Sequence, residues 1–196
     1  MITNNNDYYE ESFAGLDYAN NKFIAITFDN CVFSRCDFSA SEFRTCKFRD
    51  CSFKNCNLSL TNFPSSQFLN VHFEECKIIG VNWAYCAWSL IKLTFPLIFK
   101  SCNISQSSFM ELNLHDAQIV DSIVRDVDFR GCNLQNATLT GNDFQNSLFV
   151  KTDLTKANFR NSINYSISLV DNNVTKAKFS MPEAMSLLYS LNIEIE

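Results

Sequence analysis

The chain has 196 residues, of which 46% are hydrophobic, and it carries 16 Lys and Arg against 21 Asp and Glu. These values are typical of one soluble globular domain and exclude disordered and collagen-like chains. A net charge of -5 offers no basic surface to phosphate groups, so we expect no direct nucleic-acid binding. With only 4 Gly and 3 Pro beside 19 Phe, a sandwich built on Gly-rich turns is excluded, and other residues must form the turns.

Cysteine usage and the lack of long apolar runs indicate a cytoplasmic protein. The nine Cys are an odd number at uneven spacings, and the start, MITNNNDYYEE, lacks the basic and apolar regions of a signal peptide. We therefore expect reduced thiols. The longest apolar stretch, at about 90–99, is interrupted by Lys92, Thr94 and Pro96 and is too short to span a bilayer, so no membrane segment is expected.

Residues 1–10 are expected to form an N-terminal segment or cap, and a five-residue period follows them. From Cys36 the chain reads CDFSA SEFRT CKFRD CSFKN CNLSL, with a large apolar residue third in every block. We call this third residue the centre. Seventeen consecutive centres at 13–93 are apolar or aromatic, and a second run of 17 at 99–179 is broken only by Asn164. Eighteen of the 19 Phe are centres, so the period dominates the sequence.

The residue two positions before each centre is small or thin, and all nine Cys occupy this slot. Among the 16 Lys and Arg and the 21 Asp and Glu, only Glu11 occupies a centre or this slot. We infer that these two positions face inward and that the other three of each block face water. A small hydrophobe is required in the inner slot, and no Cys-x-x-Cys spacing occurs, so we interpret the thiols as packing groups.

The period excludes both a helix and a long flat strand. A helix would spread the centres over all its sides, and a strand would put successive centres on opposite faces. Three extended residues followed by a bend keep both inner positions on one side, and four bends close a square coil in which residues 20 apart stack at about 4.8 Å. The sequence thus predicts a parallel β-solenoid over 11–180. Its expected interior columns are Phe13, Phe33, Phe53 and Phe73; Phe28, Phe48, Phe68 and Trp88; and Cys36, Cys56 and Cys76 at a corner, with Gly15, Gly80, Gly131 and Gly141 at bends.

The two runs of centres are out of phase by one residue, which predicts a one-residue register change near Pro96. Four apolar residues around it, Tyr85, Leu90, Phe95 and Ile98, fall in outward slots. An exposed apolar patch of this kind often marks a contact surface, so these four residues and Pro96 are predicted to bind a partner. Alternatively, Pro96 bulges the wall and the four residues fold over it as a local packing repair.

Four acids follow in outward slots, each two residues after its centre: Glu111, Asp116, Asp121 and Asp126. This spacing predicts four carboxylates at successive corners of one coil. Corner Asp residues often accept backbone hydrogen bonds within bends, which is the structural interpretation. The functional interpretation is an acidic collar that contacts a basic partner surface.

The C-terminus is predicted to be a short helix over about 181–191, with a tail to 196. Ser180-Met181-Pro182-Glu183 reads as a capping box with Pro early in the helix, and apolar residues follow. The stripe of Met181, Met185, Leu188 and Leu191 is expected to cap the last coil, to pair with a second copy, or both.

No constellation for catalysis is visible in the sequence. His72 and His115 occupy outward slots without a nucleophile or metal spacing around them, and a filled solenoid offers no interior pocket. We therefore expect a protein that is not an enzyme and has no cofactor and no metal.

The repeats resemble the pentapeptide-repeat family, whose pattern is Ala-Asp/Asn-Leu-x-x. Cys132-Asn133-Leu134, Thr152-Asp153-Leu154 and Ala157-Asn158-Phe159 match it well, and the match covers about 11–180. The resemblance implies a right-handed quadrilateral parallel β-helix. The interruption, the Phe-rich first half and the C-terminal helix are similar to those of quinolone-resistance and microcin-immunity members, which bind DNA gyrase or topoisomerase IV, resemble DNA in shape and charge, and in several cases dimerise through the helix.

Two features depart from those members. The interruption is expected to add one residue, whereas some of those members carry long projecting loops, and residues 1–100 hold 10 acids and 9 bases, so this half is no strong polyanion. The first functional hypothesis is a protein-binding β-helix that protects a type II topoisomerase from quinolones or toxins. The alternative is a structural scaffold or regulator of another cytoplasmic protein.

Overall fold

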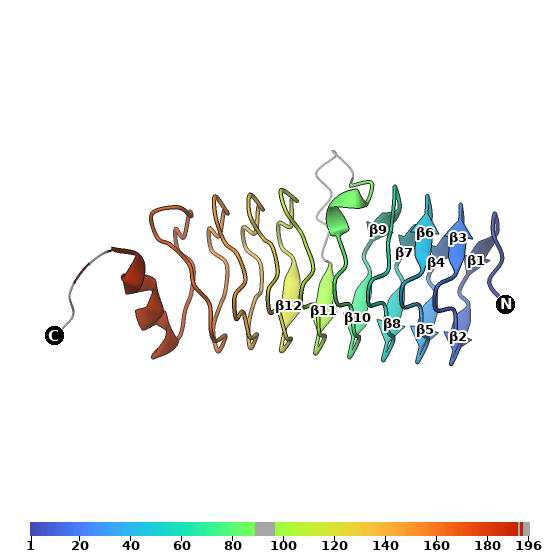
Figure 1. The fold of residues 1–196 in the computed structure, drawn as a ribbon, viewed down its shortest axis with the longest axis horizontal. Helices are drawn as coiled ribbons and strands as arrows, with labels where there is room; N and C mark the ends of the chain where they lie inside the picture. Colours follow the sequence, from blue (N-terminus) through green and yellow to red (C-terminus); the bar gives the residue numbers. More distant parts are fainter. Residues whose placement is uncertain (89–96, 192, 194–196) are drawn as a thin grey trace.

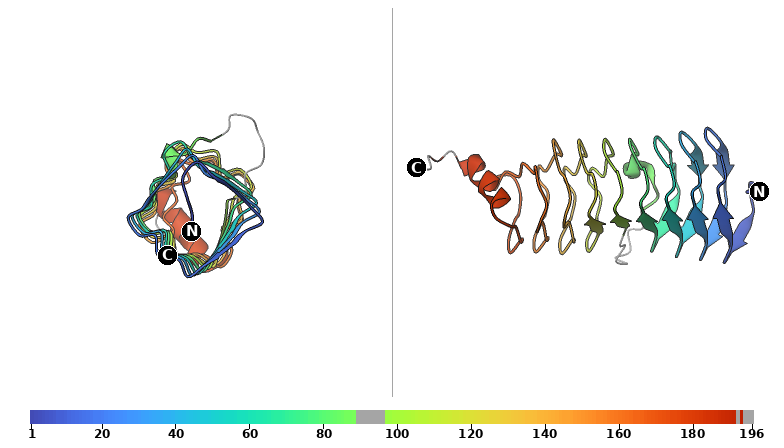
Figure 2. Two further views of the ribbon diagram at one scale, coloured as in Figure 1. Left: turned by 90° about the vertical axis from the view of Figure 1, so that its right-hand side faces the viewer. Right: turned by 90° about the horizontal axis from the view of Figure 1, so that it is seen from below.

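The computed structural model describes residues 1–88, 97–191 and 193, and these form a rod with four sides (Figures 1 and 2). Figure 2 shows the coils superimposed as one four-sided outline along the rod axis. The regular elements are short. They are β1 (Asp7–Tyr9), β2 (Ser12–Ala14), β3 (Lys22–Ile24), β4 (Thr27–Asp29), β5 (Val32–Ser34), β6 (Glu42–Arg44), β7 (Lys47–Arg49), β8 (Ser52–Lys54), β9 (Gln67–Leu69), β10 (His72–Glu74), β11 (Ile98–Lys100) and β12 (Gln118–Val120), with the 3-10 helices η1 (Trp83–Tyr85) and η2 (Glu183–Leu191).

All paired strands are parallel, and in the first half of the rod each strand pairs with the segment four blocks further along the chain. The sides are built by β1-β4-β7-β9, by β2-β5-β8-β10-β11-β12 and by β3-β6. Phe13 pairs with Phe33, Phe33 with Phe53, and Phe53 with Phe73, as the period predicts. Isolated bridges continue the same ladder as far as Asn158 and Lys178. The four-sided parallel β-helix expected from the sequence is thereby confirmed.

The register change is larger than the one residue that the sequence predicts. Phe73 pairs with Phe99, and Lys77 with Asn103, so each partner lies six positions beyond the four-block spacing. The coil gains this length between η1 and β11. Six positions equal one five-residue block plus one residue. A whole added block leaves the phase of the period unchanged, so the sequence pattern shows only the one extra residue. Leu90, Phe95 and Pro96 of the predicted contact patch lie outside the described residues.

The interior is filled by stacked rings. Phe33 and Phe53 stack at 4.5 Å between ring centroids, Phe53 and Phe73 at 5.1 Å, and Phe73 and Phe99 also at 5.1 Å across the interruption. The second predicted column is also formed, with Phe48 over Phe68 at 5.1 Å. Rings of neighbouring sides meet edge to face, an arrangement that aromatic pairs prefer.

The inner small slot puts the thiols at a corner of the coil, where large side chains have no room. All nine Cys are buried and unpaired. The backbone N–H of Cys36 donates to Sγ of Cys56, and that of Cys56 donates to Sγ of Cys76, both at 3.4 Å. Burial raises the pKa of Cys51 and of Cys132 to about 12, so these thiols stay protonated and unreactive at neutral pH.

The bends are made mainly by residues other than Gly. Among the described residues, 27 non-Gly residues and the four Gly have positive φ, nearly all two positions after a centre. Left-handed backbone costs an L-residue roughly 1–2 kcal/mol, which the stacking of neighbouring coils must offset. The residue before the centre supports the bend, since Asp37 and Asn57 each accept the backbone N–H two residues on, at 2.8 and 3.1 Å.

Short segments close both ends of the rod. At the N-terminus, Ile2 lies in the core and its N–H donates to the Tyr18 hydroxyl at 2.8 Å. At the break in the second run of centres, Asn164 is exposed with φ 58 and Tyr165 is buried instead. The Tyr165 ring lies 5.5 Å from that of Phe179, so Tyr165 fills the interior where Asn164 does not. The ladder shortens here as well, since Phe149 pairs with Ile167, two positions short of the four-block spacing.

The C-terminal helix differs in type and boundaries from the prediction. η2 is a 3-10 helix that begins at Glu183, after a cis peptide bond between Met181 and Pro182. The capping box is not formed, because both of its side chains bind the last coil. Ser180 accepts the N–H of Asn161 at 3.2 Å, and Glu183 accepts the N–H of Asn164 at 2.6 Å.

We expect the interior columns to dominate stability. Phe53 is 1% exposed, whereas Ser52 beside it points outward and is half-buried. Phe53→Ala should lower the free energy of unfolding by about 3–5 kcal/mol, and Ser52→Ala should change it by less than about 0.5 kcal/mol. Chemical denaturation of the two variants checks this, and equal effects would contradict the assigned register.

The bends give a second prediction. Ala40 has φ 52, whereas Ala14 lies in strand β2. Ala40→Gly should stabilise the protein by roughly 0.5–1 kcal/mol because Gly adopts positive φ without strain, while Ala14→Gly should destabilise it through lost backbone entropy. The two melting temperatures should therefore move in opposite directions, and a shared direction would argue against left-handed bends.

Candidate protein-binding surfaces

Because the interior is filled, the outer wall carries whatever this rod binds. Every block presents three residues outward, and each lies one strand spacing from the equivalent residues on the coils before and after. Functional groups on the wall are therefore arranged at regular intervals, set by the distance between paired strands. Within the described residues no set of three His, Cys, Asp or Glu could hold a metal, and none of their helices has the length and apolarity to cross a membrane.

The four predicted acids lie at successive corners of one coil. Glu111, Asp116, Asp121 and Asp126 have φ of 60, 64, 51 and 57, so each occupies a left-handed bend. Asp116 is half-buried and the other three are exposed. They face four different directions around the rod and do not converge on one site. We call these four residues the acidic collar.

On the next coil, two of the four residues beside the acidic collar are glycines. Gly131 follows Glu111 at the same corner, and a Cβ at Gly131 would lie 3.1 Å from Cγ of Glu111. Gly141 likewise follows Asp121, whose carboxylate lies directly over the glycine backbone. At the remaining two corners an Asn follows. Sequence reasoning missed these four neighbours, although a search four blocks after each acid would have found them.

The hydrogen bonds of the collar correct its expected structural role. Asn146 donates to the Asp126 carboxylate at 3.1 Å, and Asp116 pairs with Nδ1 of His115 at 2.8 Å. The other His115 nitrogen, Nε2, lies 3.0 Å from the Asn136 amide. The bend N–H groups are instead accepted by the residue before a centre, as at Asn133, which accepts from Gln135 at 3.0 Å. The carboxylates of Asp116 and Asp126 thus bind side chains and not the bends.

The two described residues of the predicted apolar patch, Tyr85 and Ile98, do not lie together. Tyr85 ends η1, is 62% exposed, and precedes Glu111 at the same corner of the rod. Ile98 is half-buried in β11, which belongs to another side of the rod. One full side separates the two residues.

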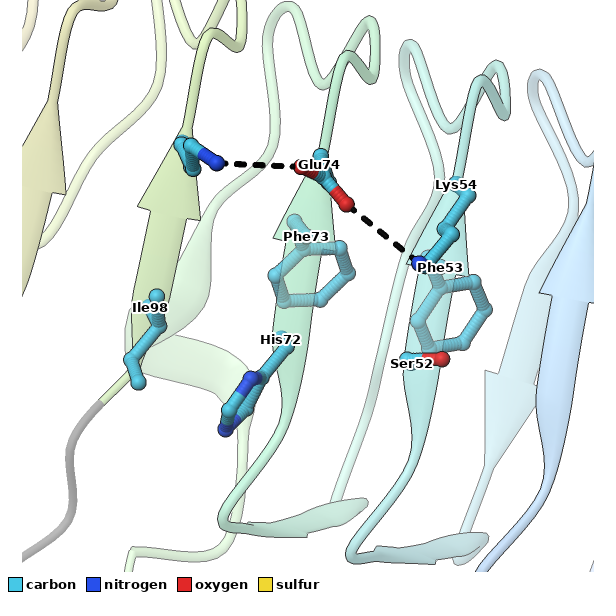
Figure 3. A pocket seen from close by; sticks show the side chains of 8 residues that line it. Ser52, Phe53, Lys54, His72, Phe73, Glu74 and Ile98 are labelled. Atoms are coloured by element: carbon cyan, nitrogen blue, oxygen red, sulfur yellow. Dashed lines mark hydrogen bonds and ion pairs between the residues drawn. The ribbon is translucent and has the colours of Figure 1, made fainter.

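A shallow hollow lies on the side built by β8, β10 and β11, beside the interruption (Figure 3). Its volume is about 360 Å³, and Glu74 lies between two lysines. Lys100 Nζ is 3.2 Å and Lys54 Nζ 3.5 Å from the carboxylate, and the Lys100 hydrogen bond holds the pKa of Glu74 below its ordinary value. These are exposed ion pairs, and His72 contacts Asn70 at 3.1 Å. Among the described residues that line it, the hollow therefore shows a charge network and no nucleophile-base pair.

The C-terminal stripe is divided between a capping and an outward role. Leu187, which the predicted stripe omits, is the buried residue of η2, at 9% exposure. Leu188 is half-buried, whereas Met181 is 70%, Met185 37% and Leu191 41% exposed. As a cap the predicted stripe is wrong, because it assumes α-helical spacing, while the 3-10 helix turns its faces differently. Pairing of the exposed Met and Leu side chains with a second copy stays a prediction.

Serines fix η2 onto the last coil. Ser190 accepts the N–H of Leu169 at 3.0 Å, and Ser186 donates to the Tyr165 carbonyl at 3.4 Å. The helix thus covers the open edge of the solenoid with polar contacts around one apolar residue. The opposite face of η2, which bears the exposed Met and Leu side chains, points away from the last coil.

A four-sided solid β-helix with five-residue blocks defines a class of solenoid whose outer wall is its working surface. A family model described as "Pentapeptide repeat region" matches residues 26–95 and 96–167. These segments cover well over half of the chain, and the protein belongs to the pentapeptide-repeat family. No sequence among curated proteins matches it.

Solved structures share the fold at low identity. A trypsin-treated form of QnrB1, a plasmid-mediated fluoroquinolone resistance protein, is 18% identical, with a TM-score of 0.71 over 96% of this chain and 99% of that one. Full-length QnrB1 is 20% identical, with a TM-score of 0.60 over 95% and 100%. HetL from the cyanobacterium Nostoc sp. strain PCC 7120, a protein involved in heterocyst differentiation regulation, is 12% identical, with a TM-score of 0.71 over 89% and 85%.

The divided role of η2 gives a testable prediction. Leu187→Ala should lower the free energy of unfolding by about 2–4 kcal/mol, because it removes the buried contact of the cap, while Leu191→Ala should cost less than about 1 kcal/mol. Denaturant titration of both variants measures the difference. If Leu191→Ala proves the more damaging, the stripe read from the sequence is the true cap.

Proposed function

We propose that this protein is a non-enzymatic binding rod whose partner is a type II topoisomerase, DNA gyrase or topoisomerase IV, and that it protects this enzyme from quinolones or toxins. The observation that carries the proposal is the acidic collar on a filled rod. Carboxylates that ring a rigid rod present negative charge to a groove that accepts DNA, and this is the basis of a DNA mimic.

The likeness to QnrB1 supports the part of the proposal that concerns quinolones. QnrB1 is a fluoroquinolone resistance protein, and its structure aligns with nearly the whole of both chains. At 18–20% identity the alignment shows a shared fold, so the evidence for the partner must come from the residues of this chain. In the collar, Glu111, Asp121 and Asp126 are exposed and so are free to meet a basic surface.

A second candidate function is that of a scaffold or regulator of another protein. It is favoured by HetL, a protein involved in differentiation regulation, which matches with the same TM-score of 0.71 as the trypsin-treated QnrB1. Fold likeness therefore does not separate the two functions. A pull-down that recovers a specific protein but no topoisomerase subunit would favour the regulator.

A supercoiling assay tests the topoisomerase proposal. We expect the purified protein to change gyrase supercoiling or to relieve its inhibition by a quinolone. The variant Asp121→Asn/Asp126→Asn should weaken the effect roughly tenfold or more, because contacts between charged groups across an interface contribute about 1.5 kcal/mol or more.

The matched control removes the same charge elsewhere. Asp50→Asn/Glu75→Gln changes two exposed corner acids of the first half of the rod and should leave the effect nearly unchanged. Equal losses in the two double variants would contradict a role for the collar. A folded wild-type protein without any effect on either enzyme would contradict the topoisomerase proposal itself.

A further inference from the structure

A second hollow, of about 510 Å³, lies between the last coil and the C-terminal helix. The helix η2 lies at the C-terminal end of the rod (Figure 1). Three segments line the hollow: residues 164–168 of the last coil, Gln145 and Asn146 of the coil before it, and Ser186, Tyr189 and Ser190 of η2. Its volume falls within the range of about 300–1,000 Å³ that is typical of small-molecule sites, so it has room for a ligand.

The hollow lies where the last coil departs from the regular period. Phe149 pairs with Ile167, 18 positions further on, where regular coils have 20. The ladder returns to 20 positions at Asp171, so two residues, Leu169 and Val170, bulge from the coil. The bulge meets η2 at Leu169, whose N–H a serine of the helix accepts at 3.0 Å. Hydrogen bonds between the coil and the helix therefore hold the hollow open between them.

The lining of this hollow is polar and uncharged. The described residues that form it are four Ser, two Asn, one Gln, two Tyr and one Ile. Burial raises the pKa of Tyr165 to about 12, so this hydroxyl stays neutral at physiological pH. A phosphate, a carboxylate or a metal ion would meet no opposite charge among these side chains, and an ion held without one is unfavourable. The lining therefore favours an uncharged ligand.

Several polar groups of the lining are available to a ligand. The side chains of Gln145, Ser166 and Tyr189 make no hydrogen bond to any described residue. The two asparagines use their amide N–H groups on aspartates, at 3.1 and 2.9 Å, and keep their carbonyl oxygens as acceptors. Hydroxyl and amide groups together offer both donors and acceptors. Ligand groups that also donate and accept, which are hydroxyls, match them best.

Tyr165 shows that hydrogen bonding is incomplete at this end of the rod. The residue is 2% exposed, and its hydroxyl has no hydrogen-bond partner among the described residues. Native structures rarely leave a buried polar group unpaired, and such a group often marks a functional place. Tyr165 belongs to the lining of the hollow, so the incomplete bonding and the free polar groups occur together.

Tyr189 adds an aromatic ring to the hollow. Its side chain is 83% exposed, and it stacks on no other ring of the described residues. A tyrosine combines a flat apolar face with a polar tip. The C–H faces of sugar rings pack against such a face, while the hydroxyls of the sugar reach the hydroxyl and amide groups beside it. An aromatic face next to uncharged donors and acceptors is thus the chemistry that recognises a sugar.

From this arrangement we propose that the hollow binds an uncharged saccharide of one or two rings. Tyr189 packs against one face of the sugar, and Gln145 and Ser166 bond its hydroxyls. The hollow lies outside the acidic collar, so this binding goes beyond the topoisomerase proposal and does not rest on it. A few neutral hydrogen bonds at an open site give weak binding, with a Kd of about 1 mM.

NMR titration of isotope-labelled protein tests the proposal. The probes are maltose, cellobiose and N,N′-diacetylchitobiose, each added up to about 50 mM, well above the expected Kd. At least one of them should shift the backbone amide signals of Ser166, Ser168 and Ser186, and the shifts should saturate. The titration then gives the Kd for that disaccharide.

A matched pair of double variants locates the binding site. Gln145→Ala/Tyr189→Ala removes two exposed contacts of the hollow and should raise the Kd roughly tenfold, because each neutral contact contributes a factor of about two to ten. Tyr9→Ala/Gln67→Ala removes the same two residue types from the exposed wall of the first half. It should leave the Kd unchanged.

Three results overturn the proposal. They are the absence of saturable shifts with all three disaccharides, shifts confined to residues outside the lining, and an equal rise of the Kd in the two double variants. Far-UV circular dichroism and melting temperature verify the fold of each variant. If Gln145→Ala/Tyr189→Ala unfolds, Ser166→Ala replaces it, with an expected rise of the Kd of roughly two- to tenfold, and an unchanged Kd in that variant contradicts the assigned contact.

Discussion

Every part of this molecule depends on the spacing between successive coils, which equals the distance between neighbouring β-strands. When residues four blocks apart lie at the strand spacing of about 4.8 Å, each position must tolerate a copy of itself above and below. Flat rings satisfy this at the centres, as Phe33 and Phe53 do at 4.5 Å, and thin side chains satisfy it at the corners, where Cys36, Cys56 and Cys76 follow one another. The filled core and the left-handed bends are consequences of the same constraint.

The constraint also decides how function can arise. A core without space leaves the wall as the binding surface, and the wall places charges at fixed intervals. Along it, Glu74 forms ion pairs with Lys100 and Lys54, which neutralises one stretch, while the acidic collar keeps an excess of negative charge. A partner would therefore recognise the stretch of the rod where charges are not neutralised, and this feature underlies the topoisomerase proposal.

Much of the fold could be predicted from the sequence because the period reports which residues face inward. The columns of Phe13 and Phe28 and the buried thiols follow from it directly. It could not reveal the size of the interruption, since an added whole block leaves the phase unchanged, and the pairings of Phe73 with Phe99 and of Lys77 with Asn103 disclose it. Local spacing also failed at η2, where Leu187 is buried, and at Tyr165, which fills the slot that Asn164 leaves. The collar corners were predictable, but their neighbours one coil later, such as Gly141 and Asn146, required the three-dimensional period of four blocks.

Nuclear Overhauser contacts between selectively labelled Phe rings test the central claim most directly. A four-sided coil predicts cross-peaks between rings four blocks apart, such as Phe33 with Phe53, and between Phe73 and Phe99, whose ring centroids lie 5.1 Å apart. If these pairs gave no cross-peaks and the rings contacted one another only as neighbours one block apart, the chain would not be wound as a four-sided coil, and the positions of its charged surfaces would be lost with it.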